Sequence, residues 1–480
     1  MLSTMIVALD GTIANVALPQ MQSSLMAAPE QVVWVLTSYL IASAIMTPLA
    51  SWLASRYGRK RVMLISAAWF TIASLACGLS VSLPMMVAAR LVQGIAGAGL
   101  IPLGQATLLD IYPPEKQGQA LAMAGLGAML GPLSGPTLGG WLTDTLTWRW
   151  VFLVNLPIGI LATGGILLAH IEARDKAIGR FDVFGFAAIS VFLASFQLMM
   201  DRGQQLDWFE SREIWIEAAV MGVCLWFTVV HMFTAKNTFV RAEIFADRNF
   251  TIGSAMSAVV GLVIFASVPL ATVMMQNLLG YTAYLTGLIS LPRGIGTVLG
   301  LLIVTRLLGR VDARALLLCG LGICAVGLYL FTKVTLETDQ MPLLVGGFLQ
   351  GLGGGLLIAP LSALVFSTMP PHLRNEGAAL YALARNMGNS IGISALQVYL
   401  LDTSALSAGR MVEGLRPDNP VMAWALPDFG FDQSGAIAAL SGVVWRQASM
   451  VATLQTLQIT LFIAIAAMPA ALLLKARKED

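Results

Sequence analysis

The sequence predicts an all-helical integral membrane protein with about fourteen spanning helices. Of its 480 residues, 57% are apolar and 11% are charged, whereas a soluble globular domain has about 45 to 50% and about 25%. A bilayer core of about 30 Å is crossed by about 20 apolar residues in a helix, and fourteen such runs follow one another along the chain. They begin near Met1, Val32, Val62, Met85, Gln119, Trp150, Val183, Ile214, Thr251, Thr286, Ala315, Pro342, Gly377 and Val451.

The charged residues indicate the orientation of the chain and exclude one class of partner. The net charge is +2, and the basic residues fall in short loops and not in a stripe interleaved with aromatics, which argues against nucleic acid as a partner. Most basic residues, including those of Arg56 to Arg61 and the C-terminal tail, lie in loops on the same side of the predicted membrane. By the positive-inside bias we expect both termini in the cytoplasm.

An internal repeat divides the chain into two halves. Gln93 to Pro114 (QGIAGAGLIPLGQATLLDIYPP) and Gln350 to Pro371 (QGLGGGLLIAPLSALVFSTMPP) align without a gap at an offset of 257, with eight of 22 positions identical. Parallel repeats of this kind relate the halves of some transporters around a central site. We therefore expect a six-helix bundle in residues 1–169, a two-helix insertion in 170–250, and a second six-helix bundle in 251–480 with a long external loop at 402–449.

Four charged residues are placed well inside the predicted spans: Asp10, Arg90, Arg293 and Arg385. Charges in hydrocarbon are costly, so a buried one is a functional candidate. Asp10 follows nine residues of the first helix, roughly 14 Å along it. Burial favours the neutral carboxyl group and a nearby cation favours the carboxylate, so an acid that alternates between these conditions can carry a proton. The alternative is a structural acid that is permanently paired.

Several motifs resemble the EmrB/QacA-type drug:proton antiporters, the fourteen-helix branch of the major facilitator superfamily. LDGTIANVALP (9–19) is similar to the first-helix motif of the family, RLVQGIAGAG (90–99) to the fourth-helix motif, and GAMLGPLSGPTLGG (127–140) to the fifth-helix motif of exporters. WRWVFLVNLPIG (148–159), MMDRGQQLDWF (199–209) and RNFTIG (248–253) look closest to the EmrB type. The resemblance covers essentially the whole chain and implies a major facilitator fold of 6 + 2 + 6 helices with a pseudo-twofold parallel repeat.

The resemblance implies roles for particular residues. Asp10 and Arg90 are expected to couple transport to protons. We place the substrate cavity at Thr12, Asn15, Tyr39, Gln93, Arg293, Arg385 and Asn386. We place conformational gating at Arg56, Gly58, Arg59, Gly127, Gly131, Pro132, Gly135 and Pro136. The loop before Arg56 departs from the superfamily pattern, because Ser51 and Ser55 stand where a glycine and an acid are usual, so a charge relay through that acid is not carried over.

The gating residues also have a physical interpretation. The glycines of the fifth-helix motif allow close helix packing, and its prolines remove backbone donors and bend the helix, so we expect a hinge at the interface between the halves. The alternative is tight packing alone. The loop Arg56 to Arg61 is expected to latch one conformation by binding carboxylates or helix ends, or else only to anchor the topology.

Three deep arginines against one deep acid predict a cavity of positive or neutral potential, suited to lipophilic weak acids or neutral amphiphiles. Arg293 and Arg385 have an alternative role, in which they bond helix-end carbonyls or extend along a helix toward water. The 24 methionines and 20 phenylalanines include candidates for an adaptable pocket lining, although most of them must face lipid or other helices.

The predicted function is export of lipophilic small molecules in exchange for protons, by alternating access, in a bacterial inner membrane. No nucleotide-binding loop, catalytic nucleophile motif or metal-ligand spacing is present in the sequence, so we expect no cofactor, no enzyme activity and an ion gradient as the energy source. The alternatives are export of one metabolite, such as a siderophore or fatty acid, and a membrane sensor that does not transport. The resemblance also implies a periplasmic adaptor and an outer-membrane channel, for which Asp201 to Glu213 and Asp402 to Ser449 are the candidate docking surfaces; otherwise these are plain solvated connections.

Overall fold

The computed structural model of the chain describes residues 2–32, 34–111, 131, 134–135, 137–168, 182–235, 238, 240–308, 310–337, 339–370, 373–415 and 434–475. Its N-terminal half contains these helices: α1 (Leu2–Ser24), α2 (Pro29–Val32), α3 (Trp34–Tyr57), α4 (Arg59–Gly78), α5 (Leu83–Gly97), α6 (Leu100–Ile111), α8 (Trp150–Leu153) and α9 (Asn155–Leu168). Residues 137–145 are also helical.

The middle and C-terminal parts of the chain contain the remaining helices. The insertion consists of α10 (Val183–Arg202), the short η2 (Trp208–Glu210) and α11 (Arg212–Thr234). The C-terminal half consists of α12 (Glu243–Ala246), α13 (Arg248–Gly261), η3 (Leu262–Ala266), α14 (Ser267–Val273), η4 (Met274–Leu278), α15 (Ala283–Leu307), α16 (Ala313–Phe331), α17 (Met341–Ser367), α18 (Arg374–Gly414) and α20 (Ser434–Leu473).

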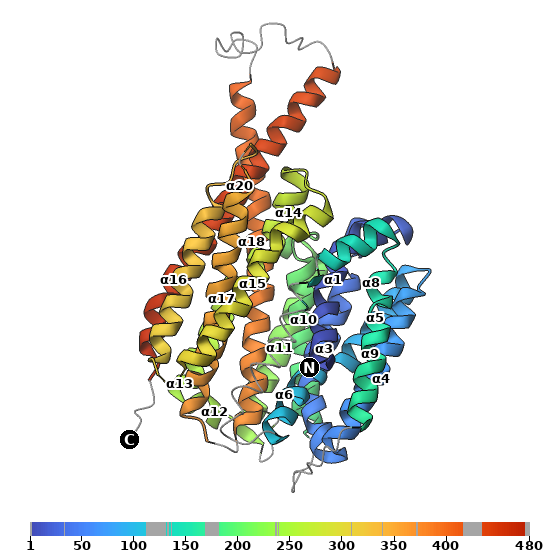
Figure 1. The fold of residues 1–480 in the computed structure, drawn as a ribbon, viewed down its shortest axis with the longest axis vertical. Helices are drawn as coiled ribbons and strands as arrows, with labels where there is room; N and C mark the ends of the chain where they lie inside the picture. Colours follow the sequence, from blue (N-terminus) through green and yellow to red (C-terminus); the bar gives the residue numbers. More distant parts are fainter. Residues whose placement is uncertain are drawn as a thin grey trace.

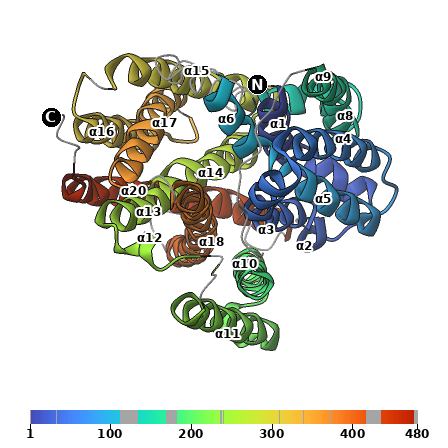
Figure 2. The same ribbon diagram turned by 90° about the horizontal axis from the view of Figure 1, so that it is seen from below.

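The helices form two bundles that stand side by side, one from each half of the chain (Figure 1). Seen along the bundles, α10 and α11 lie outside both, with α10 next to α3 and α18 (Figure 2). In the described part of the chain, 12 helices are long and apolar enough to cross a membrane, and each corresponds to one of the fourteen predicted runs. Of the other two runs, one is α3, whose apolar stretch Trp34–Thr47 is shorter, and the other begins outside the described residues.

Side-chain caps set where several helices begin. Asp182 accepts a hydrogen bond from the backbone N–H of Gly185 at the start of α10, and Asp247 accepts one from Phe250 at the start of α13. Each carboxylate satisfies a backbone donor that the first turn of a helix leaves without a partner. Between α3 and α4 the chain reverses at Gly58, whose φ of 93° is in the region that glycine adopts without strain.

The ninth predicted span contains two π-helical turns, η3 and η4. A π turn inserts an extra residue and leaves a backbone carbonyl outside the regular hydrogen-bond ladder. Arg293 Nη2 donates to Ile264 O in η3 at 2.7 Å, and Arg446 Nε donates to Leu278 O in η4 at 2.8 Å. An arginine therefore supports each irregular turn.

A helical stalk extends from the C-terminal bundle. The helices α18 and α20 have 41 and 40 residues, about 60 Å at 1.5 Å per residue, or about twice the thickness of a bilayer core. Their extensions, residues 402–414 and 434–449, project from one end of the molecule (Figure 1); we call them the stalk. They lie within the segment predicted as a loop, and their described parts are helical because Ala408, Val444 and Ala448 pack between the two extensions.

Candidate functional site

Asp10 is buried in the N-terminal bundle and is surrounded by hydrogen-bond donors. Its side chain is 0% exposed and that of Arg90 is 1% exposed. Arg90 Nη1 lies 2.6 Å from Asp10 Oδ2, while Gln93 Nε2 and Asn155 Nδ2 donate to Oδ1 at 2.9 and 2.8 Å. Three donors on two carboxylate oxygens form an arrangement that fits the ionised acid. The four residues, which we call the Asp10 site, come from α1, α5 and α9.

Arg90 connects the Asp10 site to α3. Its Nη1 also donates to Gln93 Oε1 at 2.9 Å, and its Nε donates to the carbonyl oxygen of Val35 at 2.9 Å. The guanidinium carbon lies 4.3 Å from the ring centre of Tyr39 and 5.5 Å from that of Phe152, close enough for cation–π attraction. Arg90 is therefore held by one acid, one amide, one carbonyl and two aromatic faces, and its contacts reach α1, α3 and α8.

Two polar residues in or beside the Asp10 site were not among the predicted functional residues. Asn155 lies in the WRWVFLVNLPIG motif and starts α9, and Ser74 on α4 accepts hydrogen bonds from Gln93 and Asn155 at 3.2 and 3.1 Å. Both side chains are fully buried. The sequence feature that could have identified Asn155 is an asparagine within an apolar helix, because an amide in hydrocarbon requires partners.

The fifth-helix glycines pack directly on α1 beside Asp10. A Cβ atom at Gly131 would overlap the backbone of Ala8 and Leu9, and one at Gly135 would overlap Thr12. Thr12 Oγ1 also lies 3.2 Å from Gly131 O. The described glycines therefore provide close helix packing, which is one of the two interpretations of this motif. Gly127, Pro132 and Pro136 of the same motif lie outside the described residues.

The same helix also contacts the other half of the chain. A Cβ atom at Gly287 of α15 would lie 2.7 Å from the Cα atom of Thr137. The segment after Gly131 thus lies between α1 of the N-terminal half and α15 of the C-terminal half. The segment therefore contacts both halves of the chain.

The other predicted cavity residues are spread over different surroundings. Tyr39 is buried against Arg90, next to the Asp10 site, whereas Asn15 on α1 is exposed and its Nδ2 lies 3.5 Å from Gly11 O. On α18, Arg385 is half-buried and Asn386 is exposed.

Arg293 lies in the C-terminal bundle and not beside the Asp10 site. Its bond to the π-turn carbonyl of Ile264 matches the interpretation in which a deep arginine binds a helix carbonyl. Close by, Ser267 Oγ also donates to Ile264 O, at 3.0 Å, and accepts a hydrogen bond from Gln350 Nε2 at 2.6 Å. Arg293 and Ser267 therefore share an acceptor.

The predicted gating loop joins α3 to α4 at the end opposite the stalk. Arg56 is exposed with its guanidinium 5.7 Å from the ring centre of Trp52, and Lys60 Nζ donates to Leu167 O of α9 at 2.9 Å. Arg59 is half-buried and makes its own polar contacts. Basic side chains of this loop thus bind within the N-terminal bundle, including one helix-end carbonyl.

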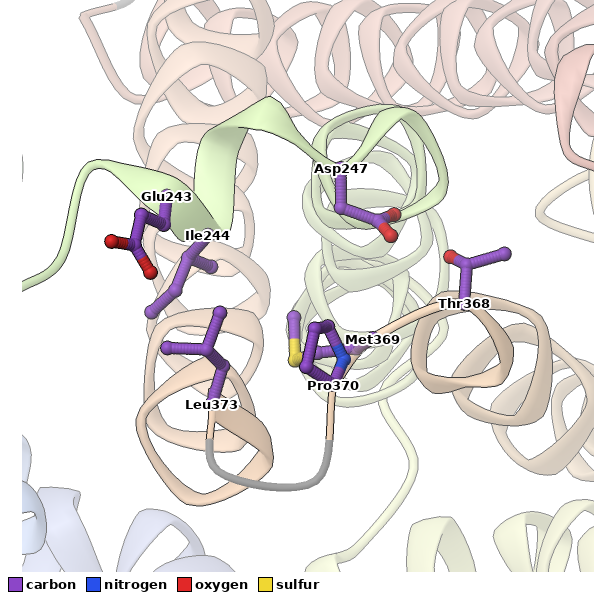
Figure 3. A pocket seen from close by; sticks show the side chains of 7 residues that line it. All are labelled: Glu243, Ile244, Asp247, Thr368, Met369, Pro370 and Leu373. Carbon is purple, nitrogen blue, oxygen red and sulfur yellow. The ribbon is translucent and has the colours of Figure 1, made fainter.

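A cavity of about 310 Å³ lies beside α12 and the start of α13 (Figure 3), at the end of the C-terminal bundle opposite the stalk (Figure 1). Its walls are α12, the start of α13 and the connection from α17 to α18, and its lining residues are Glu243, Ile244, Asp247, Thr368, Met369, Pro370 and Leu373. The lining includes none of the predicted substrate residues, and Asp247 already caps α13. This cavity is therefore separate from the Asp10 site.

Two helical bundles, with 12 described helices long and apolar enough to cross a membrane and a buried acid–arginine pair inside the N-terminal bundle, are typical of a multi-pass membrane transporter. Residues 1–393 match the model of the Major Facilitator Superfamily. The chain is 36% identical over 423 residues to multidrug export protein EmrB of Escherichia coli strain K12, covering 87% of this chain and 82% of that protein. It is 33% identical over 411 residues to fatty acid resistance protein FarB of Neisseria gonorrhoeae, covering 85% and 81%. The chain belongs to the Major Facilitator Superfamily and, within it, to the family of the EmrB proteins.

Solved structures confirm the fold. A bacterial homolog of the human lysosomal transporter Spinster superposes with a TM-score of 0.58 at 18% identity, covering 98% of this chain and 95% of that one. The xylose transporter XylE of E. coli, in a partially occluded inward open conformation, superposes with a TM-score of 0.58 at 11% identity, covering 100% and 97%. The predicted major facilitator fold is therefore correct.

Proposed function

We propose that the chain exports lipophilic small molecules in exchange for protons, and that its work is transport and not catalysis. The observation that carries this proposal is the Asp10 site, a fully buried carboxylate paired with Arg90 and packed against the fifth-helix glycines. A buried ion pair is a costly way to stabilise a fold, so its presence in a transporter favours a functional role. The similarity to multidrug export protein EmrB supports the same substrate class.

Protonation of Asp10 supplies the switch in this mechanism. The ionised acid holds Arg90, Gln93 and Asn155 in the arrangement described above. A neutral acid releases the charge on Arg90 and becomes a hydrogen-bond donor itself. Within the described residues, Asn155 Oδ1 is buried without a hydrogen-bond donor, which makes it an acceptor for that proton after a rotation of the amide. The rearranged α1 then packs differently on Gly131 and Gly135, and the bundles reorient.

Drug-driven proton flux in proteoliposomes tests this function. We expect Asp10→Asn to fold, because the amide retains the volume of the acid, and to lose uphill export on a pH gradient. Asp144→Asn is the matched control, because Asp144 is exposed and its substitution should leave the flux unchanged. Export by Asp10→Asn at the wild-type rate would reject Asp10 as the coupling acid. Absence of any drug-dependent flux in the wild-type protein would favour a sensor.

We infer that weak lipophilic acids are among the substrates. Arg385 is half-buried on α18, and a partly desolvated cation attracts an anion more strongly than it does in water. The similarity to fatty acid resistance protein FarB supports the alternative of one dedicated amphiphilic acid. A growth-inhibition panel in an efflux-deficient host separates the two: protection against several unrelated compounds favours multidrug export, and protection against fatty acids alone favours the dedicated exporter.

We further propose a bacterial inner-membrane location with both termini in the cytoplasm, which places the stalk in the periplasm. The stalk is then available to a periplasmic adaptor that leads to an outer-membrane channel. Leu406, Val412, Val443 and Trp445 are exposed on it, and apolar side chains that extend beyond the bilayer fit a protein partner. Replacing Leu406 and Trp445 by serine should abolish co-purification of the adaptor, whereas Arg410→Ser, at an exposed charge on the same extension, should not. Co-purification unaffected by all three changes would place the adaptor elsewhere, for example on Asp201 to Glu213.

A further inference from the structure

A chain of hydrogen bonds at the stalk end of α10 connects the two bundles. Thr37 Oγ1 on α3 donates to Asp201 Oδ2 at 2.6 Å, and Gln197 Nε2 donates to Asp201 Oδ1 at 3.0 Å. Ser390 Oγ on α18 donates to Gln197 Oε1 at 2.8 Å. We call Thr37, Asp201, Gln197 and Ser390 the Asp201 chain. It runs from the N-terminal half through the insertion to the C-terminal half.

The insertion helix is held by its two neighbours in different ways. Against α18 it shares a hydrophobic cluster, formed by Ile189, Phe192 and Leu193 of α10 with Leu380, Leu383 and Met387 of α18. Among the described residues, none of α3 belongs to this cluster, although α10 also runs directly beside α3. At the stalk end the two helices are joined by the hydrogen bond of Thr37 and by the ring of Trp34 facing Arg202. The cluster joins α10 to the C-terminal bundle by apolar packing, and the hydrogen bond of Thr37 joins α10 to α3 at the stalk end, so a change at Asp201 acts on the contact with α3.

Within the described part of the chain, the carboxylate of Asp201 is bound by neutral hydrogen-bond donors and not by a neighbouring cation. The adjacent Arg202 points to the other insertion helix, where its Nη2 and Nη1 lie 2.6 and 3.4 Å from carboxylate oxygens of Glu213 and Glu217. The groups that face Asp201 from α3 and from its own helix are the hydroxyl of Thr37 and the amide of Gln197. Hydrogen bonds to a charged acceptor are stronger than neutral ones, so the two bonds to Asp201 are the strong part of the chain.

The first turn of α3 is the place where the Asp201 chain meets the Asp10 site. Arg90 Nε holds the carbonyl oxygen of Val35, two residues before Thr37. The same helical turn is therefore bound by the arginine of the Asp10 site and by the acid of the insertion helix. A shift of Arg90 on protonation of Asp10 displaces the turn that carries Thr37.

We propose that Asp201 is a positioning residue of the transport cycle: through Thr37 it fastens the stalk end of α3 to the insertion and the C-terminal bundle, and it releases α3 when that end of the molecule opens. This assigns a task to the two inserted helices. They stay with the C-terminal bundle and hold α3 of the N-terminal bundle. The proposal rests on alternating access, the proposed function, but the state of the latch is measurable without transport.

Spin-label distances across the stalk end of the membrane domain test the latch. Labels at Val81→Cys and Glu337→Cys, both exposed, report the separation of the two bundles in a protein whose exposed Cys319 is serine. The measurement uses lipid nanodiscs without drug or pH gradient. We expect Asp201→Asn to raise the ratio of long to short distances about tenfold, because a charged acceptor of two hydrogen bonds is lost. Asp207→Asn is the matched control: Asp207 is exposed with φ 52°, which asparagine tolerates, and it should leave the ratio unchanged.

A second variant distinguishes a latch from a general structural role. Thr37→Val keeps the shape of the side chain and removes only the donor, so it should shift the distance ratio in the same direction. If Thr37 and Asp201 act through one bond, the double variant shifts the ratio less than the sum of the single shifts. An unchanged distance distribution in Asp201→Asn, or fully additive shifts, would overturn the proposal. These outcomes do not depend on whether Asp10→Asn abolishes proton-coupled export, which tests the proposed function separately.

Discussion

Gln93 and Gln350 make corresponding hydrogen bonds in the two halves of the chain. Gln93 Nε2 donates to Asp10 Oδ1 at 2.9 Å, and Gln350 Nε2 donates to Ser267 Oγ at 2.6 Å. The offset of 257 that relates the two glutamines also relates Asp10 to Ser267. The C-terminal half thus has a hydroxyl where the N-terminal half has a carboxylate, and the acid of this repeated position is present in one half alone.

The correspondence predicts that an acid can be introduced at Ser267. Because Ser267 and Arg293 donate to the same carbonyl of Ile264, Ser267→Asp places a carboxylate beside a guanidinium. We expect the variant to fold, whereas adding Arg293→Met leaves the new charge unpaired at a further cost of about 3 kcal/mol. Thermal unfolding of the two single variants and the double variant measures this coupling. A loss on Ser267→Asp that does not depend on Arg293 would show that the two side chains do not meet.

The sequence predicts the Asp10–Arg90 pair because charges are rare in apolar helices and the resemblance names their partners. It does not single out Ser74 or Asn155, because uncharged polar residues are frequent in membrane helices and bring no comparable energetic penalty. The hydrogen bonds that join them to Asp10 link helices far apart in the sequence. Only the fold brings these helices together.

The ends of the membrane-spanning helices are harder to predict from the sequence than the presence of the helices. Asp201 is placed in an external turn by its polar neighbours, yet it lies in the last turn of α10 and bonds to Thr37. The stalk is assigned to a loop because its helices lack an apolar run of membrane length. They are stabilised by apolar contacts with each other, which hydropathy along a single segment does not reveal.

The packing of the fifth-helix motif predicts strong sensitivity to side-chain size. Gly135 lies against Thr12 of α1 without room for a Cβ atom. Gly135→Ala should therefore displace α1 and lower the free energy of unfolding by about 1 to 3 kcal/mol. We expect it to lower drug export at least tenfold. Gly164→Ala is the matched control, because no atom lies within 4 Å of a Cβ there. Export rates in proteoliposomes and thermal unfolding are the measurements. Equal, small effects of both substitutions would mean that the close contact is unimportant.

Substrate charge provides a test of the arginine on α18. If Arg385 attracts the anionic form of a substrate, Arg385→Ala should weaken export of lipophilic acids about tenfold, the value of one charge-assisted hydrogen bond, and leave export of neutral dyes nearly unchanged. Arg410→Ala, at an exposed stalk position, is the control. Competitive export of an acid and a neutral dye by the same vesicles gives the ratio directly. A parallel loss for both substrates at equal protein levels would instead assign Arg385 a structural role.

Arg90→Lys separates the charge of Arg90 from its geometry. The guanidinium uses Nη1 for Asp10 and Gln93 and Nε for the Val35 carbonyl, whereas a lysine ammonium is a single point of charge and does not reach these acceptors in the same arrangement. The positive charge beside Asp10 is kept, so the variant should fold with a stability loss below that of Arg90→Ala, which leaves a buried carboxylate unpaired at a cost of about 3 to 5 kcal/mol.

For transport, we expect Arg90→Lys to lower drug–proton exchange about 10- to 100-fold, because the link from the Asp10 site to the first turn of α3 is lost with the Nε–H donor. Thermal unfolding and exchange rates, measured on the same preparations with Arg410→Lys as control, separate the two effects. Wild-type exchange by Arg90→Lys would show that charge alone suffices and that the bond to Val35 carries no part of the coupling.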